Sequence, residues 1–334
     1  MTSNGSEVTD SVCEVWENVP HRVLRATYIG VDLVLTMFGN VLTIVVTRKV
    51  EEFSDSTKMM FTSLALADLG VAFVAATSFA AEISGGWIFP MWICEASFIS
   101  FYIFTAVSVF MLVIMTFDRL VAVVRPLRYS LILTKGRSLV AIAFVWLACT
   151  VGAIFTTITN QIIYNKCSAL CSTKDRNILQ SVVAIVTYYF IPLTLIVLMN
   201  VKLLSVAHQH ARRFRNQVVA TPAVSINLER AHVQHHPRST LRGKAVGVVT
   251  LVTFAFIVSW SLFYVKLILN AASDEGVNFP EGIEFASIWL GLTNSWWNVI
   301  MYSVMNRSFR QHLKSVLRRL CSWLPERFRD ICRR

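Results

Sequence analysis

Charged residues are scarce in this chain. Asp, Glu, Lys and Arg make up only 15% of its 334 residues, whereas 55% are hydrophobic. Because a soluble globular domain has a charged fraction of about a quarter, this composition excludes an ordinary soluble domain and places most of the chain in lipid. Residues 1–21 also lack the apolar segment of a cleaved signal peptide. We therefore expect the first membrane span to act as its own insertion signal.

Acidic residues are scarcer than basic ones, and the net charge is +11. Such an excess can indicate nucleic-acid binding. Here, however, the basic residues fall in blocks between apolar segments rather than along one folded face. This distribution is typical of membrane-topology signals, so we expect no nucleic-acid partner.

Seven apolar segments have the length of membrane spans. The third, residues 96–115, contains no charge and is long enough to cross about 30 Å of hydrocarbon as a helix. The spans cover approximately residues 26–47, 59–81, 96–115, 139–159, 178–206, 246–269 and 283–305. The sequence therefore predicts an all-α membrane protein, with a seven-transmembrane helix bundle at 26–305 between an amino-terminal segment (1–25) and a carboxy-terminal segment (306–334).

Loop charge predicts the orientation of the bundle. With this assignment, 25 of the 31 Lys and Arg residues fall on one side, which the positive-inside rule makes cytoplasmic. The amino terminus is then extracellular, as in a multi-pass plasma-membrane protein. There, Asn4 of Asn4-Gly5-Ser6 fits the acceptor sequence for N-glycosylation.

Four cysteines, Cys13, Cys94, Cys167 and Cys171, fall on the extracellular side. An even number of cysteines in an oxidising compartment predicts disulfides among them. Cys149, within the fourth span, is most simply a small buried apolar residue.

Asp68 stands at the middle of the second span, where a carboxylate is costly unless polar partners or water surround it. Uncharged polar residues occur at a similar depth in other spans, namely Asn40, Ser108, Asn294 and Asn298. Two interpretations stay open. The group could form a hydrated pocket for a small hard cation such as sodium, or a hydrogen-bond network that joins the helices. Asp32 is the other candidate for a carboxylate within the bilayer.

Short motifs in all seven spans resemble those of rhodopsin-like (class A) G-protein-coupled receptors, and their pattern is nearest to the amine-receptor-like group. The motifs are GNVL, SLALAD, Cys94 followed by DRLVAVVRPLRY, Trp146, FIP, FIVSWSLF and NSWWNVIMY, in chain order. The resemblance extends from about residue 26 to 320 and implies the seven-helix fold.

The resemblance also implies roles for individual residues. It implies a G-protein coupling switch at Asp118, Arg119, Asn298 and Tyr302. It implies a packing switch beneath the ligand at Val109, Pro192, Phe256 and Trp260, although simple core packing also explains Phe256 and Trp260. It implies a sodium site at Asp68, Ser108, Asn294 and Asn298. Finally, it implies a disulfide between Cys94 and Cys171, which leaves Cys13 and Cys167 to pair or stay free.

Four positions depart from the family's pattern. Leu120 and Asn200 stand where the family usually has tyrosine, and Leu262 and Val299 stand where it usually has helix-kinking prolines. Without these prolines the backbone hydrogen bonds are restored, so we expect straighter sixth and seventh helices.

Phe101 stands where the third helix of amine receptors carries an aspartate that pairs with the ligand's ammonium group. A neutral ring cannot form that salt bridge, so a simple amine ligand is disfavoured. The matching pocket positions are largely apolar and aromatic and suit an apolar or weakly polar molecule: Phe101, Thr105, Tyr188, Phe263, Tyr264, Ile288 and Trp289. Lys266 and Glu284 would either pair with each other or meet a charged group of the ligand. The seventh span contains no lysine to hold retinal, which excludes an opsin.

The cytoplasmic segments contain two further features. His232, His235 and His236 lie in a polar loop, where solvated histidines are a more common finding than a metal site. After the seventh span, apolar residues at helical spacing from Phe309 to Leu320 face away from basic residues, which predicts an amphipathic helix on the anionic inner leaflet. Cys321, at the end of this helix, is a palmitoylation candidate.

These patterns predict a receptor, not an enzyme, that couples an extracellular ligand to a heterotrimeric G protein and contacts membrane lipid. No cofactor other than a structural sodium ion is expected. The alternative is a seven-helix transporter or intramembrane enzyme, which would normally show more charge within the spans.

Overall fold

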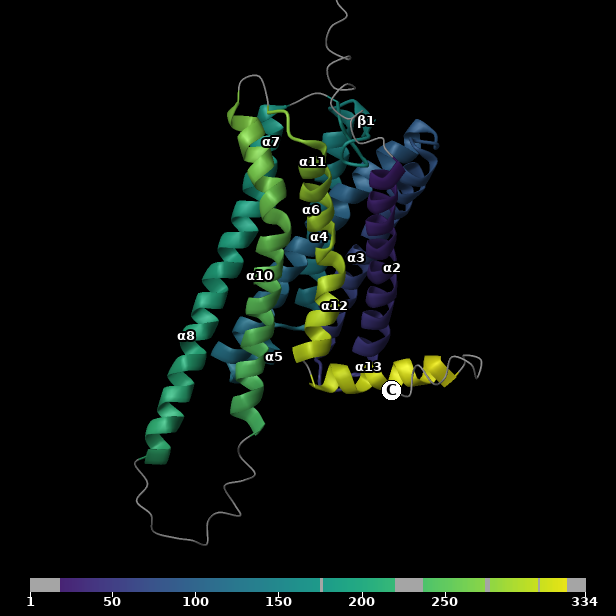
Figure 1. Ribbon diagram of the computed structural model, residues 1–334. Coiled ribbons are helices and arrows are strands. Elements are labelled where there is room, and N and C mark those ends of the chain that lie inside the picture. The colour runs from purple at the N-terminus through teal and green to yellow at the C-terminus, as the bar shows by residue number, and fades with distance from the viewer. Residues whose placement is uncertain (1–18, 175–176, 220–236, 274–276, 306, 323–334) are drawn as a thin grey trace, which may run out of the picture.

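The computed structural model describes residues 19–174, 177–219, 237–273, 277–305 and 307–322 (Figure 1). Asn4, Cys13 and the three loop histidines lie outside these residues. The helices are α2 (Val19–Lys49), α3 (Asp55–Ser84), α4 (Met91–Val124), η2 (Pro126–Arg128), α5 (Tyr129–Ile132), α6 (Lys135–Ile158), α7 (Ile178–Ile185), η3 (Val186–Phe190), α8 (Ile191–Val219), α10 (Pro237–Ala272), α11 (Glu281–Leu292), α12 (Asn294–Met305) and α13 (Arg307–Ser322).

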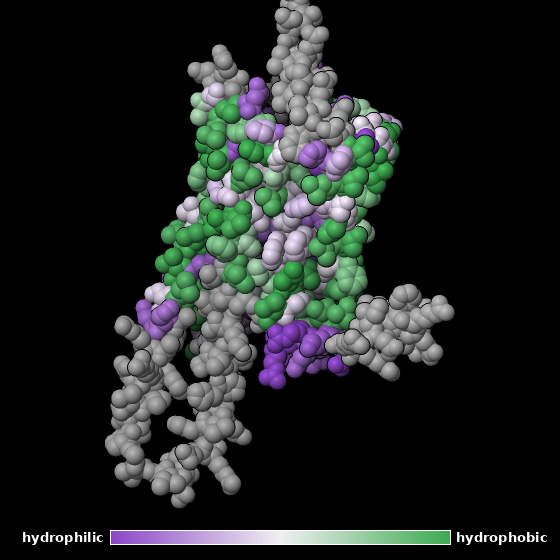
Figure 2. Space-filling model, in the orientation of Figure 1, coloured by the Kyte–Doolittle hydropathy of each residue, from purple (hydrophilic) through white to green (hydrophobic). Residues whose placement is uncertain are grey.

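The long helices form one bundle, and its side surface is apolar. Six of the spans are helices long and apolar enough to cross a membrane. The seventh consists of α11 and α12, which with Thr293 between them cover 281–305, about 37 Å of helix. On the face that Figure 2 shows, hydrophobic residues cover much of the side of the bundle, and the most hydrophilic residues lie toward its two ends. The predicted all-α seven-helix membrane fold is therefore confirmed.

Local capping sets the ends of α3. The Ser54 side chain accepts a hydrogen bond from the Thr57 N–H, which satisfies one free amide at the start of the helix. At the other end, Gly85 adopts a φ of 77°, a left-handed conformation that lets its N–H bond back to helix carbonyls. These caps fix how much of α3 crosses the bilayer and thus the depth of Asp68.

The fifth span contains a π-helical turn, η3, directly before Pro192. Proline has no N–H, so it cannot complete the helical ladder at its own position. The Ile191 N–H instead reaches back five residues to the Val186 carbonyl. The turn widens the helix just where Tyr188 and Tyr189 face the interior of the bundle.

The helices are unbroken at both positions that lack a proline. Helix α10 continues past Leu262, and α12 continues past Val299. The seventh span is interrupted elsewhere, at Thr293. There the backbone N–H of Trp296 bonds to the Thr293 carbonyl only three residues back, and the Thr293 hydroxyl donates to the Leu290 carbonyl. The straightness of the two helices stays a prediction.

Helix α13 lies across one end of the bundle, below α2 and α12 (Figure 1). Its apolar face packs against that end: Phe309 and Val316 are buried beside Leu42, Val46 and Tyr302. Its basic residues form part of the hydrophilic surface at this end of the molecule (Figure 2). The predicted short helix after the last span is confirmed.

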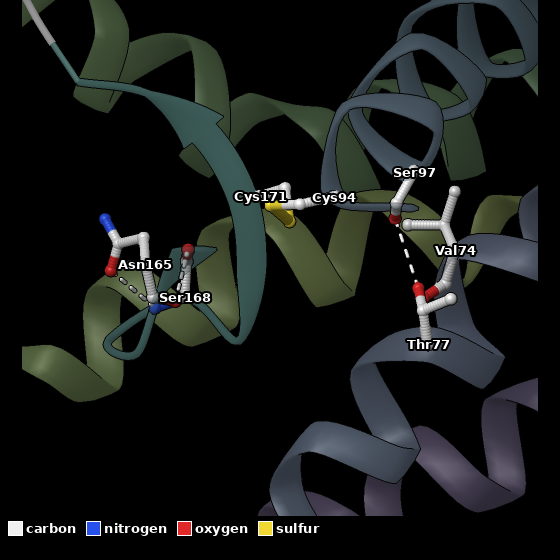
Figure 3. The surroundings of a disulfide bond; sticks show 7 residues. All are labelled: Val74, Thr77, Cys94, Ser97, Asn165, Ser168 and Cys171. Atoms are coloured by element: carbon white, nitrogen blue, oxygen red, sulfur yellow. Dashed lines mark hydrogen bonds between the residues drawn. A yellow bond between two sulfur atoms is a disulfide. The ribbon is translucent and has the colours of Figure 1, made fainter. Parts of the chain in front are cut away.

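At the opposite end, a β-hairpin covers the bundle. Its strands β1 (Ile162–Asn165) and β2 (Leu170–Thr173) are antiparallel, with Tyr164 opposite Cys171. The predicted disulfide is confirmed: Cys171 of β2 is bonded to Cys94 near the start of α4 (Figure 3). Cys167 is disulfide-bonded as well, so it does not stay free, whereas Cys149 is a buried free thiol.

Candidate functional site

A small cavity lies between α4, the fifth span and α10, beneath the hairpin. Five of the predicted pocket residues line it, namely Phe101, Thr105, Tyr188, Phe263 and Tyr264. Val109 and Trp260 of the predicted packing switch form part of the same wall. The residues that sequence reasoning missed are Tyr102, Ala106, Ala184 and Leu267. Helical spacing was the available signal, because Tyr102, Thr105, Ala106 and Val109 share one face of α4.

Aromatic rings fill most of this region. Trp260 lies 5.6 Å from Phe263 and 6.5 Å from Phe101 between ring centroids, and Tyr189 stacks on Tyr264 at 4.1 Å. The remaining free space is only about 40 Å³, enough for a few water molecules at most. Because small-molecule pockets usually enclose about 300 Å³ or more, a ligand here must displace some of these rings.

Four predicted pocket residues lie outside the cavity lining. Lys266 donates to the Glu284 carboxylate at 2.6 Å, so this pair joins α10 to α11. Trp289 is fully buried, and its indole N–H donates to the Ser168 carbonyl of the hairpin turn at 2.9 Å. Ile288 packs in the main hydrophobic core. These contacts hold the wall and the cover of the cavity.

The predicted packing switch extends from the cavity wall into the hydrophobic core. Phe256 is fully buried, and Val109 and Trp260 belong to the same cluster. Pro192 is buried at the end of the π-helical turn. These side chains form a continuous apolar connection between the cavity and the deeper polar residues.

Those polar residues surround Asp68. Its two carboxylate oxygens accept hydrogen bonds from Ser108 at 3.0 Å and Asn298 at 3.2 Å. Ser295, absent from the sequence prediction, lies beside the same carboxylate. Asn294 is also buried, and its Oδ1 has no hydrogen-bond partner within the described residues. The structure thus brings together oxygen ligands of the kind that a small hard cation prefers.

The Asp118 and Arg119 pair lies near the carboxy-terminal end of α4. Arg119 Nε lies 3.5 Å from one Asp118 oxygen, and the Tyr129 hydroxyl of α5 donates to the other at 2.7 Å. Burial raises the pKa of Tyr129, and the adjacent carboxylate raises it further, so this phenol stays a donor at neutral pH. Tyr129 was missed because the loop sequence alone does not show that it turns back onto α4.

Tyr302, near the end of α12, packs edge-on against Phe61 and Phe309. It therefore connects α12 to both α3 and α13. Its hydroxyl is buried and has no hydrogen-bond partner within the described residues. A buried, unsatisfied hydroxyl is costly, so a rearrangement that supplies a partner would stabilise the alternative state.

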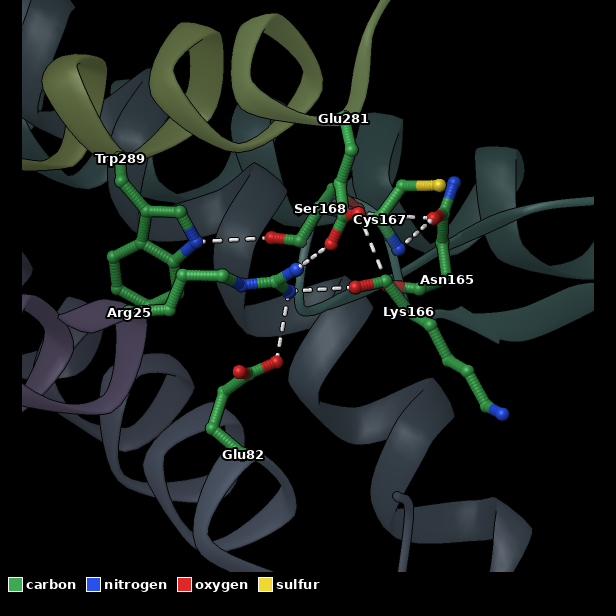
Figure 4. A network of polar contacts seen from close by, with 8 residues as sticks. All are labelled: Arg25, Glu82, Asn165, Lys166, Cys167, Ser168, Glu281 and Trp289. Atoms are coloured by element: carbon green, nitrogen blue, oxygen red, sulfur yellow. Dashed lines mark hydrogen bonds and ion pairs between the residues drawn. The ribbon is translucent and has the colours of Figure 1, made fainter. Parts of the chain in front are cut away.

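A buried ion cluster at the hairpin end of the bundle was not predicted (Figure 4). The Arg25 guanidinium contacts the carboxylates of Glu82 and Glu281 and also donates to the Lys166 carbonyl at 2.6 Å. It lies over the Phe285 ring as well, 4.9 Å from the centroid. One side chain therefore ties α2 to α3, α11 and the hairpin. The three charges stand near span ends, where sequence patterns do not distinguish them from ordinary loop charges.

Comparison with known proteins agrees with this arrangement. Residues 39–302 match the family described as 7 transmembrane receptor (rhodopsin family). The chain is 25% identical to octopamine receptor beta-2R of Chilo suppressalis, with 95% of this chain and 85% of the relative covered. It is 24% identical to the dog histamine H2 receptor, again with 95% of this chain and 85% of the relative covered. It is 23% identical to the dog 5-hydroxytryptamine receptor 2C, with 90% of this chain and 73% of the relative covered.

These relatives are all receptors, which sets aside the transporter and intramembrane-enzyme alternatives. The matched region runs from within the first span to near the end of the seventh, and it includes the cavity, Asp68 with its polar partners, and the Asp118 and Arg119 pair. The chain therefore belongs to the rhodopsin family of seven-transmembrane receptors and is a G-protein-coupled receptor similar to the amine receptors.

Proposed function

We propose that this receptor lies in the plasma membrane with its amino terminus outside and converts the binding of an apolar or weakly polar ligand into activation of a heterotrimeric G protein. The proposal rests on the residues that α4 places at its two ends. This helix presents Phe101 to the cavity at one end and the Asp118 and Arg119 pair at the other. One rigid element thus connects a neutral ligand site to the coupling switch.

The ligand class follows from the cavity walls. Relatives that are named for octopamine, histamine and 5-hydroxytryptamine favour an amine as the ligand. However, Phe101 occupies the position of the amine-binding aspartate, and among the described residues no carboxylate lines the cavity. An ammonium group would lose its hydration without gaining an ion pair there. A neutral ligand with one or two hydrogen-bonding groups for Thr105 or Tyr188 fits better.

Signal transmission requires a ligand that binds two arrangements of the bundle with different affinity. A ligand that displaces the rings around Trp260 would move Phe256 directly beneath them. Movement of α10 relative to α4 and α12 would then release Arg119 from Asp118 and expose it to a G protein.

We also propose that Asp68, Ser108, Asn294 and Asn298 hold a sodium ion. The unpartnered Asn294 Oδ1 and the buried Asp68 carboxylate fit such an ion. A bound cation would supply charge compensation to Asp68 and hold α3, α4 and α12 in the present arrangement.

A G-protein turnover assay in membranes, with and without ligands, tests the proposal. We expect neutral apolar compounds to change turnover more than protonated amines of the same size. Arg119→Ala should remove most of the turnover, whereas Arg128→Ala, at an exposed position of the same inner loop, should not. Undiminished turnover in Arg119→Ala at equal surface expression would contradict the proposed coupling role.

A further inference from the structure

The seventh helix is divided at Thr293, a division that the missing proline does not explain and that we treat as a hinge. Val299 allows a regular helix, yet the helix is interrupted at Thr293. The segment after the interruption, α12, contains Asn298 and Tyr302 of the proposed coupling switch. Whatever fixes the first turns of α12 therefore fixes the position of both residues.

Helix α2 makes three contacts to those turns. The Asn40 amide donates to the Ser295 carbonyl at 3.0 Å. One carboxylate oxygen of Asp32 accepts a hydrogen bond from the Trp296 indole N–H at 2.9 Å. One helical turn further on, Gly39 faces Val299 so closely that a Cβ at Gly39 would meet the Val299 side chain at 3.0 Å. The absence of a side chain at Gly39 lets α12 rest directly on α2.

The contact from Asp32 is the most unusual of the three. Asp32 is 3% exposed, although it lies within a membrane span. Its second oxygen, Oδ2, has no hydrogen-bond partner in the part of the chain that the structure describes. A buried carboxyl group without hydrogen-bond partners is costly in this setting. The indole is therefore the contact on which the local position of Asp32 depends.

We propose that Asp32 is a positioning residue that clamps α12 to α2 through Trp296 and holds the hinge at Thr293 in the resting arrangement. The proposal rests on the proposed coupling function. The present arrangement is the resting one, because Asp118 still holds Arg119 and also accepts from Tyr129. Loss of the clamp then shifts the population of α12 toward its alternative position.

A fluorine NMR probe on α12 tests this position directly. A trifluoromethyl tag is attached through Val304→Cys, since Val304 is 62% exposed, in a receptor with Cys321→Ser and Cys332→Ser. Wild type should show one dominant peak. In Asp32→Ala and in Trp296→Phe, which keeps a ring but loses the N–H donor, a second peak should grow about threefold to tenfold relative to the first. Asp32→Asn still accepts the indole hydrogen bond and should resemble wild type.

The double variant Asp32→Ala/Trp296→Phe separates a specific clamp from general damage. If the two residues act through one bond, the double variant should shift the peaks no more than either single variant. Additive shifts, or spectra of Asp32→Ala identical to wild type, would overturn the clamp. If a single variant does not fold, the purified Asp32→Asn receptor with and without Trp296→Phe gives the same comparison.

Ligand-free G-protein turnover of the same proteins then separates the two proposals. If Asp32→Ala raises the turnover and adding Arg119→Ala abolishes the increase, both the clamp and the coupling function are supported. If the fluorine spectrum shifts but turnover is the same in every variant, including Arg119→Ala, the clamp is supported and the coupling function is contradicted. Unchanged spectra with turnover that depends on Arg119 contradict the clamp alone.

Discussion

Tyr129 donates a hydrogen bond to Asp118 at 2.7 Å, and its oxygen also lies 3.2 Å from the Ser54 hydroxyl. The short helix α5 is thereby connected both to the proposed coupling switch on α4 and to the start of α3. The pair of Asp118 and Arg119 is thus supported by the segment that follows α4, not only by its own helix.

Tyr129→Phe should raise ligand-free G-protein turnover about threefold to tenfold, because a hydrogen bond to a carboxylate contributes about 1.5–3 kcal/mol and the site is partly solvated. The ligand-free turnover is measured as nucleotide exchange in membranes that contain equal amounts of each receptor variant. Leu127→Ala, at a 94% exposed position of the same loop, is the control. A rise of the same size in Leu127→Ala would show that general loop disturbance is responsible.

Asp68→Asn should abolish the stabilisation of the purified receptor by sodium. The carboxylate supplies the negative charge among the oxygen ligands, and an amide cannot replace it. The measurement is the shift in thermal unfolding temperature between sodium and potassium chloride at equal ionic strength. Asp32→Asn changes the other carboxylate within the spans and should keep the full shift. Equal sodium shifts in wild type and Asp68→Asn would place the ion elsewhere.

Arg25→Gln should lower stability by about 3–5 kcal/mol, because it leaves the buried carboxylates of Glu82 and Glu281 without compensation. Thermal unfolding of the purified receptor measures the loss. Arg22→Gln is a matched control, since Arg22 is more exposed and donates to the Ile83 carbonyl instead. Glu281→Gln added to Arg25→Gln should restore part of the stability, and a further loss would count against charge compensation.

Asn200 donates to the Thr253 hydroxyl at 2.7 Å and so joins α8 to α10. Thr253→Val should destabilise the receptor by about 1–3 kcal/mol, because it leaves a buried amide donor unsatisfied. Asn200→Leu/Thr253→Val removes both polar partners and should be closer to wild type in thermal unfolding. A double variant as unstable as the sum of the single variants would argue against a direct bond.

Phe101→Asp should weaken the response to neutral apolar ligands and create a response to protonated amines, because it places a carboxylate at the cavity wall. Dose-response curves for G-protein activation with both ligand classes provide the test. Phe101→Asn adds polarity without charge and should lose the apolar response without gaining the amine response. A gain in Phe101→Asn as large as in Phe101→Asp would contradict the ion-pair explanation.

The spans could be predicted from sequence because their signal is local: within each, some twenty residues nearly lack charge. The Cys94–Cys171 bond required the family resemblance, since four extracellular cysteines allow several pairings. Composition could not have predicted the Arg25 cluster, because its partners are 57 and 256 residues away along the chain. Likewise, a missing proline is a local signal, whereas the hydrogen bond between Asp32 and Trp296 joins residues 264 positions apart along the chain.

Contacts to three described helices fix the hairpin over the cavity: the Cys171 disulfide to α4, the Ser168 carbonyl bound by Trp289, and the Lys166 carbonyl bound by Arg25. A cover attached to α4, α11 and α2 cannot swing away as one piece, because that motion would break bonds to three helices at once. Ligand exchange must then wait for rarer local openings. We expect slow association, well below the diffusion limit, together with long residence times once a ligand is enclosed.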